Sequence, residues 1–178
     1  MKINLKKIYT PVLLVLIFFL PGIAAITVFQ NPDLLSSAKV NHGELLSPPM
    51  QLTSQDPDNK WQMMYWNPNG CDKSCLSQLD KLARLRLALG RRLYQVNITY
   101  VGTNELGALD KTQLNLFKEY DIQWLLPSDE QQSKLEALSK DSRVYIADPK
   151  GYLILAYQTD ENPHNIHKDL KKLLNVKE

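Results

Sequence analysis

The sequence predicts an α/β protein with a mixed sheet flanked by helices, preceded by one N-terminal transmembrane helix. Three observations predict it: an uncharged run over residues 9–29, alternating strand-like and helix-like segments after residue 41, and a hairpin pattern over residues 143–157. With 178 residues, 44% of them hydrophobic and 22% charged, the chain has apolar material for one core but not for two. We therefore expect one folded domain behind the membrane segment.

The uncharged run at the N-terminus is predicted to be a membrane anchor. It is about 21 residues long, and a helix of about 20 residues spans a bilayer. Three lysines precede it, which favours a cytoplasmic location for residues 1–8 and export of everything after the anchor. A cleaved signal peptide is the alternative, because the small residues Gly22, Ala24 and Ala25 follow the apolar stretch. Residues 30–40 have the composition of a linker, and residues 41–178 form the exported domain.

The first half of this domain contains two predicted strands and the clearest helix. Residues 41–46 end at two prolines, which cannot join a central strand pairing, so this segment is predicted to lie at a sheet edge. Residues 61–66 are rich in aromatic residues and carry no charge, as is typical of a buried strand. Alternation along the strand sends Met63 and Met64 into the core on opposite faces. Residues 72–89 carry apolar side chains at steps of three and four, which predicts a helix.

The second half continues the alternation and ends in a hairpin and a helix. We expect strands at 96–101 and 122–126, helices at 111–120 and 131–138, a hairpin of strands 143–147 and 152–157, and a final helix at 163–174. Strand, helix, strand, helix, hairpin and helix in this order are what a thioredoxin-like fold requires.

The candidate functional group is the pair Cys71 and Cys75, at the junction between the buried strand and the clearest helix. Residues four apart on a helix lie one above the other, with Cα atoms about 6 Å apart, within the range of a disulfide. A thiol in the first turn faces unpaired backbone N–H groups, which lowers its pKa, and we interpret Cys71 as the nucleophile. A fixed structural disulfide is the alternative, although so short a loop removes little entropy from the unfolded chain.

The segment from Asn67 to Cys75, Asn-Pro-Asn-Gly-Cys-Asp-Lys-Ser-Cys, and the turn Asp148-Pro-Lys-Gly-Tyr152 resemble the Sco/SenC family of cytochrome oxidase copper-assembly factors. The resemblance covers residue 41 to the C-terminus in the order of elements. It implies a periplasmic, redox-active dithiol at the inner (cytoplasmic) membrane. Such a dithiol reduces partner disulfides or holds Cu(I) for delivery to the oxidase, and thiolates are the ligands that Cu(I) prefers.

The family's copper-ligating histidine has no counterpart, since the stretch before the hairpin reads Ser-Lys-Asp-Ser from Ser139 to Ser142. The resemblance therefore implies a divergent member in which Cys71 and Cys75 are the metal ligands. His42 is the best replacement for the missing ligand if the N-terminal arm reaches the dithiol. Each of the three histidines, His42, His164 and His167, is otherwise interpreted as a surface residue.

Three functions remain open at this stage. The first is assembly of the oxidase copper centre by thiol–disulfide exchange or Cu(I) handling, with an oxidase subunit or another disulfide-bearing client as partner. The second is a non-catalytic, membrane-tethered interaction module with a structural disulfide, and the third is a thiol–disulfide oxidoreductase of cytochrome c maturation. Nucleic-acid binding is not indicated, because 21 basic and 19 acidic residues are mixed along the chain.

Overall fold

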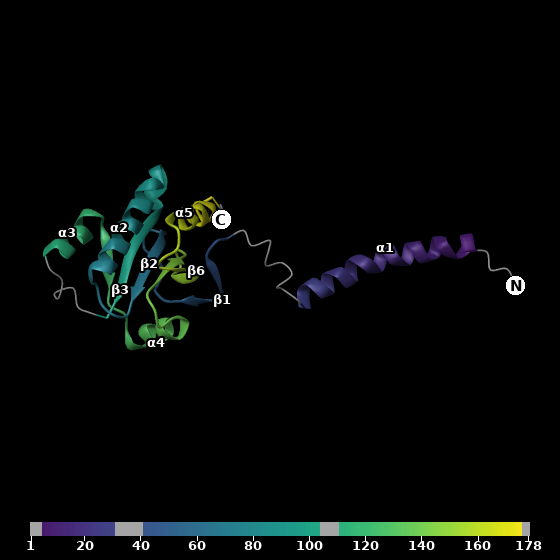
Figure 1. Ribbon diagram of the computed structural model, residues 1–178, viewed down its shortest axis with the longest axis horizontal. Coiled ribbons are helices and arrows are strands. Elements are labelled where there is room, and N and C mark those ends of the chain that lie inside the picture. The colour runs from purple at the N-terminus through teal and green to yellow at the C-terminus, as the bar shows by residue number, and fades with distance from the viewer. Residues whose placement is uncertain (1–4, 31–40, 104–110, 176–178) are drawn as a thin grey trace. The chain divides into compact units, whose positions relative to one another are not determined.

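The computed structural model describes residues 5–30, 41–103 and 111–175, and the chain divides into two compact units at residue 40 (Figure 1). The predicted linker, residues 30–40, lies outside the described residues except for its first. The elements are, in chain order, α1 (Leu5–Gln30), β1 (Glu44–Gln51), β2 (Trp61–Asn67), α2 (Lys73–Ala88), the 3-10 helix η2 (Gly90–Gln95), β3 (Val96–Gly102), α3 (Lys111–Glu119), β4 (Ile122–Leu125), α4 (Asp129–Leu138), β5 (Arg143–Ala147), β6 (Tyr152–Gln158) and α5 (Pro163–Leu173).

Helix α1 forms the first unit and suits a membrane anchor. Its segment Leu13–Gln30 has a mean hydropathy of 2.4 and is long and apolar enough to cross a membrane. Pro11 and Pro21 lie inside the helix, as membrane helices tolerate. The large side chains of Phe18 and Phe29 are 78% and 88% exposed, so their burial requires surroundings outside the unit itself.

The second unit is built on one six-stranded mixed sheet in the order β1-β6-β5-β2-β3-β4. Strands β2, β3 and β4 are parallel, whereas β5, β6 and β1 join by antiparallel pairing. The hairpin of β5 and β6 forms at the predicted turn, where the Asp148 side chain accepts hydrogen bonds from the backbone N–H groups of Lys150 and Tyr152. This arrangement confirms the predicted fold class.

Helices cover both faces of the sheet and enclose two cores. One core contains Met63, Leu79 of α2, Phe117 of α3 and Ile166 of α5, so these three helices share a face. The other contains Met64 with Leu135 of α4 (Figure 1). The two methionines are 0% and 1% exposed, which confirms that both are core residues on opposite faces.

Strand β1 differs from the prediction, which ended it at residue 46. It runs on through Ser47, Pro48 and Pro49 to Gln51, and its pairing with β6 shifts register between Leu45 and Met50. Because β1 is an edge strand that pairs on one side, a register shift lets the prolines sit where no N–H is needed. The prediction of an edge position was correct, but the prediction of its end was wrong.

Helix boundaries also moved where side chains cap the backbone. Helix α4 begins at Asp129 rather than at residue 131, because Ser128 and Gln131 form a reciprocal capping box. Helix α2 begins at Lys73 with Asp72 as its cap, and Gly90 follows its end with a φ of 61°, a conformation that glycine adopts readily.

Candidate dithiol site

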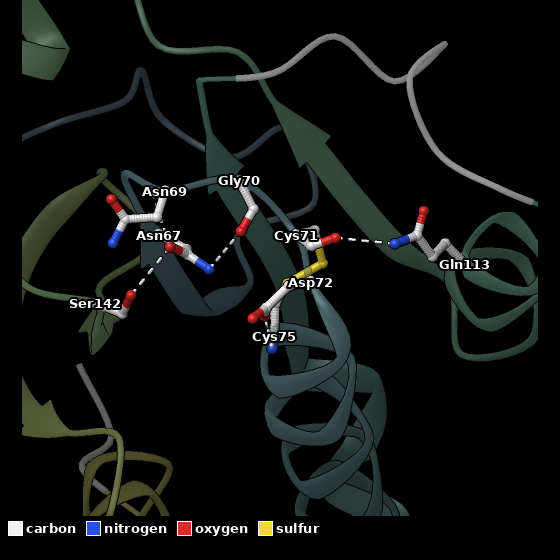
Figure 2. The surroundings of a disulfide bond; sticks show 8 residues. All are labelled: Asn67, Asn69, Gly70, Cys71, Asp72, Cys75, Gln113 and Ser142. Atoms are coloured by element: carbon white, nitrogen blue, oxygen red, sulfur yellow. Dashed lines mark hydrogen bonds between the residues drawn. A yellow bond between two sulfur atoms is a disulfide. The ribbon is translucent and has the colours of Figure 1, made fainter.

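Cys71 and Cys75 are joined by a disulfide, with their Cα atoms 5.1 Å apart (Figure 2). Cys71 lies in the turn that leads from β2 to α2, and Cys75 is the third residue of α2. The parallel strands β2 and β3 end next to this turn, since Asn67 pairs with Gly102. The site therefore stands at the carboxyl edge of the parallel strands, where chain reversals leave polar groups accessible.

The two sulfur-bearing residues differ in exposure. Cys75 is 0% exposed and belongs to the core under α2, whereas Cys71 is half-buried and packs against the edge of that core. The helix begins at Lys73, one residue later than predicted, so Cys75 rather than Cys71 lies in its first turn. An incoming sulfur reaches Cys71 more easily, because a thiolate must approach the sulfur that it attacks.

Asn67 shapes the turn that carries Cys71. Its side-chain Nδ2 donates to the Gly70 carbonyl at 2.7 Å, and its Oδ1 accepts from the Asn69 backbone N–H and from the Ser142 hydroxyl, each at 3.0 Å (Figure 2). Gly70 has a φ of 83°, which places it in the left-handed region. Asn67 is 5% exposed, and these three bonds satisfy it inside the protein.

The role of Asn67 was missed by the sequence interpretation. The signal was present, because asparagine followed by Pro-Asn-Gly is a typical turn in which the side chain bonds the backbone two residues on. Its partner Ser142 stands directly before β5, in the stretch where the resembled family carries its histidine.

Asp72 and Gln113 hold the backbone on either side of the disulfide. The Asp72 carboxylate accepts from the Cys75 backbone N–H at 2.9 Å. Gln113 of α3 donates from Nε2 to the Cys71 carbonyl at 2.9 Å (Figure 2). Since Asp72 already neutralises the positive end of α2, it opposes a negative charge on a nearby sulfur.

A polar hollow of about 470 Å³ is lined by the residues on either side of Cys71, and neither cysteine is itself among its lining residues. Its lining includes the two neighbours of Cys71, the Asn67–Ser142 pair, and side chains of β2 and the β6–α5 loop: Gly70, Asp72, Asn67, Ser142, Tyr65 and Asp160. Burial raises the pKa of Tyr65, a side-chain hydrogen bond with Ser142 lowers it in part, and the charge of Asp72 raises it further. Tyr65 therefore presents a neutral hydroxyl at neutral pH.

His42 lies in a different part of the sheet. Its backbone N–H and its Nδ1 bond to the Asp169 carboxylate of α5, at 2.6 and 3.1 Å. It precedes β1, which is three strands from β2, or about 14 Å at about 4.8 Å per strand. The interpretation of His42 as a copper ligand stays a prediction, and this arrangement gives it no support.

The remaining histidines also lie away from the sulfur atoms. His164 and His167 on α5 line a hollow together with Arg84 and Ala88, in the C-terminal half of α2. Arg84 is nine residues beyond Cys75, or about 14 Å at about 1.5 Å per residue.

The donor atoms near the dithiol do not fit a copper centre with three protein ligands. Reduced Cys71 and Cys75 would supply two soft sulfur ligands. Over residues 5–30, 41–103 and 111–175, however, the structure brings together no group of three histidine, cysteine, aspartate or glutamate side chains that could hold a metal.

One family model matches the chain over residues 61–177, described as "Transmembrane-like, thioredoxin-like, C-terminal domain". The chain belongs to this family. The match contains the dithiol turn, the hairpin and the helices α2 to α5 that the structure describes in the second unit. No curated protein is similar enough to count as a relative.

Three solved structures are similar to this chain to different degrees. The apo Sco1 protein from Thermus thermophilus has a TM-score of 0.56 to this chain at 16% identity, covering 75% of this chain and 97% of that one. Copper-bound yeast Sco1 has a TM-score of 0.48 at 18% identity, covering 67% and 80%. The thioredoxin domain of a thiol-disulfide oxidoreductase from Bacteroides vulgatus has a TM-score of 0.45 at 15% identity, covering 75% and 97%. The first of these and the family model confirm the predicted thioredoxin-like fold and its likeness to Sco proteins.

Proposed function

We propose that this protein is a membrane-anchored thiol–disulfide exchange protein, in which Cys71 reacts with a client and Cys75 resolves the intermediate. The observation that carries the proposal is the difference in exposure at one disulfide: Cys71 is half-buried beside a polar hollow, and Cys75 is 0% exposed. A stapling disulfide needs no such asymmetry. Disulfide exchange does, because one sulfur must meet the client while the other waits.

The exchange proceeds in two balanced steps. In the reduced protein, the Cys71 thiolate attacks one sulfur of a client disulfide, and the other client sulfur leaves as a thiolate. Cys75 then loses its proton and attacks the Cys71 sulfur, which closes the Cys71–Cys75 bond and releases the second client sulfur. Two electrons pass from the dithiol to the client, and the same steps reversed oxidise a client dithiol. The relative reduction potentials of the two pairs set the direction.

The client that we propose is a disulfide on a cytochrome oxidase subunit, in the periplasm and at the inner membrane. The sequence resemblance from Asn67 to Cys75 supports this placement, and so do the shared fold and the lysines before the anchor. Cytochrome c maturation offers other clients of the same chemistry. Either client is an exported protein with a disulfide that Cys71 can reach.

Copper handling has its own test, because the described residues do not supply a third ligand beside the dithiol. The reduced protein is titrated with Cu(I), and X-ray absorption counts the sulfur and nitrogen neighbours. A nitrogen neighbour that disappears in His42→Ala would restore a Sco-type copper site to the proposal. Two sulfurs and no nitrogen would argue against such a site.

Trapping tests the exchange proposal directly. In a Cys75→Ser strain the client remains bound to Cys71 as a mixed disulfide, since no resolving sulfur is present. We expect a client adduct that is sensitive to reductant and is resolved by a non-reducing gel. The matched control is Cys71→Ser, in which the remaining Cys75 is buried and traps no client. Equal adducts in both variants, or none in either, would contradict the assigned roles.

A further inference from the structure

A second hollow lies between α2 and α5. It is lined by the C-terminal half of α2, whereas the disulfide is at the N-terminal end of that helix. Its volume is about 460 Å³, and Leu85, Ala88 and Pro163 contribute its apolar lining. We name it the α2–α5 groove. Ala88 and Pro163 are exposed, whereas Leu85 is buried at its floor. The groove therefore presents apolar surface to solvent between two helices, a geometry that accepts a side chain from a third helix.

Basic side chains surround this apolar floor. Lys81 and Arg84 of α2 and His164 and His167 of α5 complete the lining, and no acidic residue is among the lining residues, although Arg84 pairs with Asp80 of α2 at 2.9 Å. The helices themselves are basic: α2 has four lysine or arginine residues to one aspartate, and α5 has three lysines to one aspartate, which is Asp169 and is buried. On the opposite face of the sheet, α4 has three acidic residues to one lysine. The charge around the groove thus selects acidic partners.

Lys81 connects the groove to the dithiol. It lines both the α2–α5 groove and the polar hollow beside Cys71. A polypeptide lying along the exposed side of α2 would fill the groove with one apolar side chain and extend into the polar hollow. An anionic lipid, the other occupant that this charge would attract, gives no reason for the two hollows to adjoin.

We propose that the α2–α5 groove is a docking surface for an acidic, amphipathic segment of the polypeptide client. Identifying the docked protein as the dithiol's client rests on the proposed function. Docking depends only on the residues of the groove. The groove holds the client in place while Cys71 reacts. The groove adds affinity for one class of protein, which the small exposed surface of the disulfide does not supply.

The test uses the full chain in phosphatidylcholine nanodiscs and a fluorescein-labelled probe peptide. The probe is a helical peptide of glutamates with leucines at every third and fourth position. Two further probes replace its glutamates by lysines or its leucines by alanines. We expect fluorescence anisotropy to show saturable binding of the first probe alone, weakening as salt rises past about 0.1 M, where charges are screened beyond about 10 Å.

Matched variants localise the binding. Ala88→Glu puts a carboxylate into the groove and should weaken binding at least about tenfold, since a like charge in an interface costs several kcal/mol. Ala137→Glu makes the same change at an exposed alanine of α4 and should leave binding unchanged. Lys81→Gln should weaken binding about threefold, and Lys118→Gln at an exposed lysine of α3 should not. Equal affinities within either pair, or binding of the lysine probe, would overturn the proposal.

Two outcomes separate docking from exchange. Cys71→Ser protein should bind the probe with full affinity, so failure of the exchange proposal leaves this measurement intact. Ala88→Glu should leave the reduction of a small disulfide unchanged. Nanodiscs containing phosphatidylglycerol supply the lipid arm. If these nanodiscs abolish probe binding to the wild type, and if Ala88→Glu protein loses its contact with the anionic lipid, the groove binds lipid and the peptide proposal is rejected.

Discussion

Two regions of the molecule each bury a hydrogen-bonded polar side chain, but with different results. One is the turn that carries Cys71, which is held by Asn67. The other, which we name the Asp169 clasp, consists of Asp169 with His42, Gly43 and Tyr157. In each, one buried polar side chain gathers several hydrogen bonds. Asn67 bonds Gly70, Asn69 and Ser142. One oxygen of Asp169 accepts from the backbone N–H groups of His42 and Gly43 and from the Tyr157 hydroxyl, and its other oxygen bonds the His42 ring. Asn67 is 5% exposed and Asp169 is 2% exposed. Burial of a satisfied polar group therefore does not by itself distinguish a site from a structural support.

The difference lies in what each group holds. Asp169 joins the start of the domain to α5, and a Cβ on Gly43 would lie about 2.5 Å from the Tyr157 ring, so the enclosure leaves no space for a partner. Asn67 instead holds a turn whose next side chain, Cys71, is half-buried beside a hollow. A polar network supports function where it fixes a reactive group that it does not cover.

The largest expected effect is the loss of stability in Asp169→Asn. The substitution replaces a carboxylate that takes part in four hydrogen bonds by an amide, and leaving buried donors unpaired costs about 3 kcal/mol. Chemical denaturation of the full chain in micelles measures the change. Asp129→Asn, at an exposed position of α4, should alter stability by less than about 1 kcal/mol. Similar losses in both variants would show that the clasp is not a structural support.

Asp169 also predicts a loss of stability at acidic pH. Burial raises the pKa of Asp169, but hydrogen bonds from Gly43, His42 and Tyr157 outweigh it and hold the pKa below the ordinary value of 3.8. Its stabilisation is therefore complete well above pH 3.8 and is lost as pH falls through the lower folded value. Asp169→Asn should lack this component of acid unfolding. An unchanged difference in stability between wild type and variant down to pH 2 would contradict it.

The second effect concerns the two sulfurs. After reduction, Cys71 in Cys75→Ser should react with iodoacetamide at least about a hundredfold faster than Cys75 in Cys71→Ser, because reactive thiols are accessible and buried ones are inert. Mass spectrometry of timed samples measures both rates. Comparable alkylation rates would contradict the assignment of Cys71 as the accessible cysteine that reacts with the client.

The third effect tests the network on the dithiol side. Asn67→Ala should cost about 1 to 2 kcal/mol, less than Asp169→Asn, because it removes neutral rather than charged hydrogen bonds. It should also change the alkylation rate of Cys71, whereas Asp169→Asn should not. A change in reactivity from Asp169→Asn equal to that from Asn67→Ala would erase the distinction between the two regions.

The smallest effect is electrostatic. Asp72→Asn keeps a side-chain cap for the Cys75 N–H but removes a negative charge, so alkylation of Cys71 in Cys75→Ser protein at pH 7 should rise about threefold at low salt. Asp80→Asn, two turns farther along α2, is the control and should change the rate less. A slower reaction in Asp72→Asn would mean that capping outweighs charge at this sulfur.

The sequence predicted the fold because its periodicities are local and clear. The buried strand at 61–66, the helix in α2 and the hairpin turn at 148–151 each carry their own pattern, and each is found in the structure. The prediction errors concern the ends of strands and helices. The bulge that admits Pro48 depends on pairing with β6, and the start of α4 was set by a capping box, Ser128 with Gln131, that was overlooked.

The site was predictable only in part. The proximity of Cys71 and Cys75 follows from their spacing, but their unequal exposure follows from packing on strands far away in sequence. Gln113 reaches Cys71 across 42 residues and Asp169 reaches His42 across 127, and no local pattern encodes such pairs. A long-range contact therefore places His42 on the Asp169 carboxylate, and the sequence could not indicate that contact.

The reduction potential of the Cys71–Cys75 pair tests the central claim most directly. The full chain in micelles is equilibrated with glutathione buffers of defined potential, and the reduced fraction is read by alkylation. We predict a potential above about −300 mV, within the range where a dithiol exchanges with cellular partners. A potential below about −300 mV would identify a permanent structural disulfide and contradict the proposed exchange.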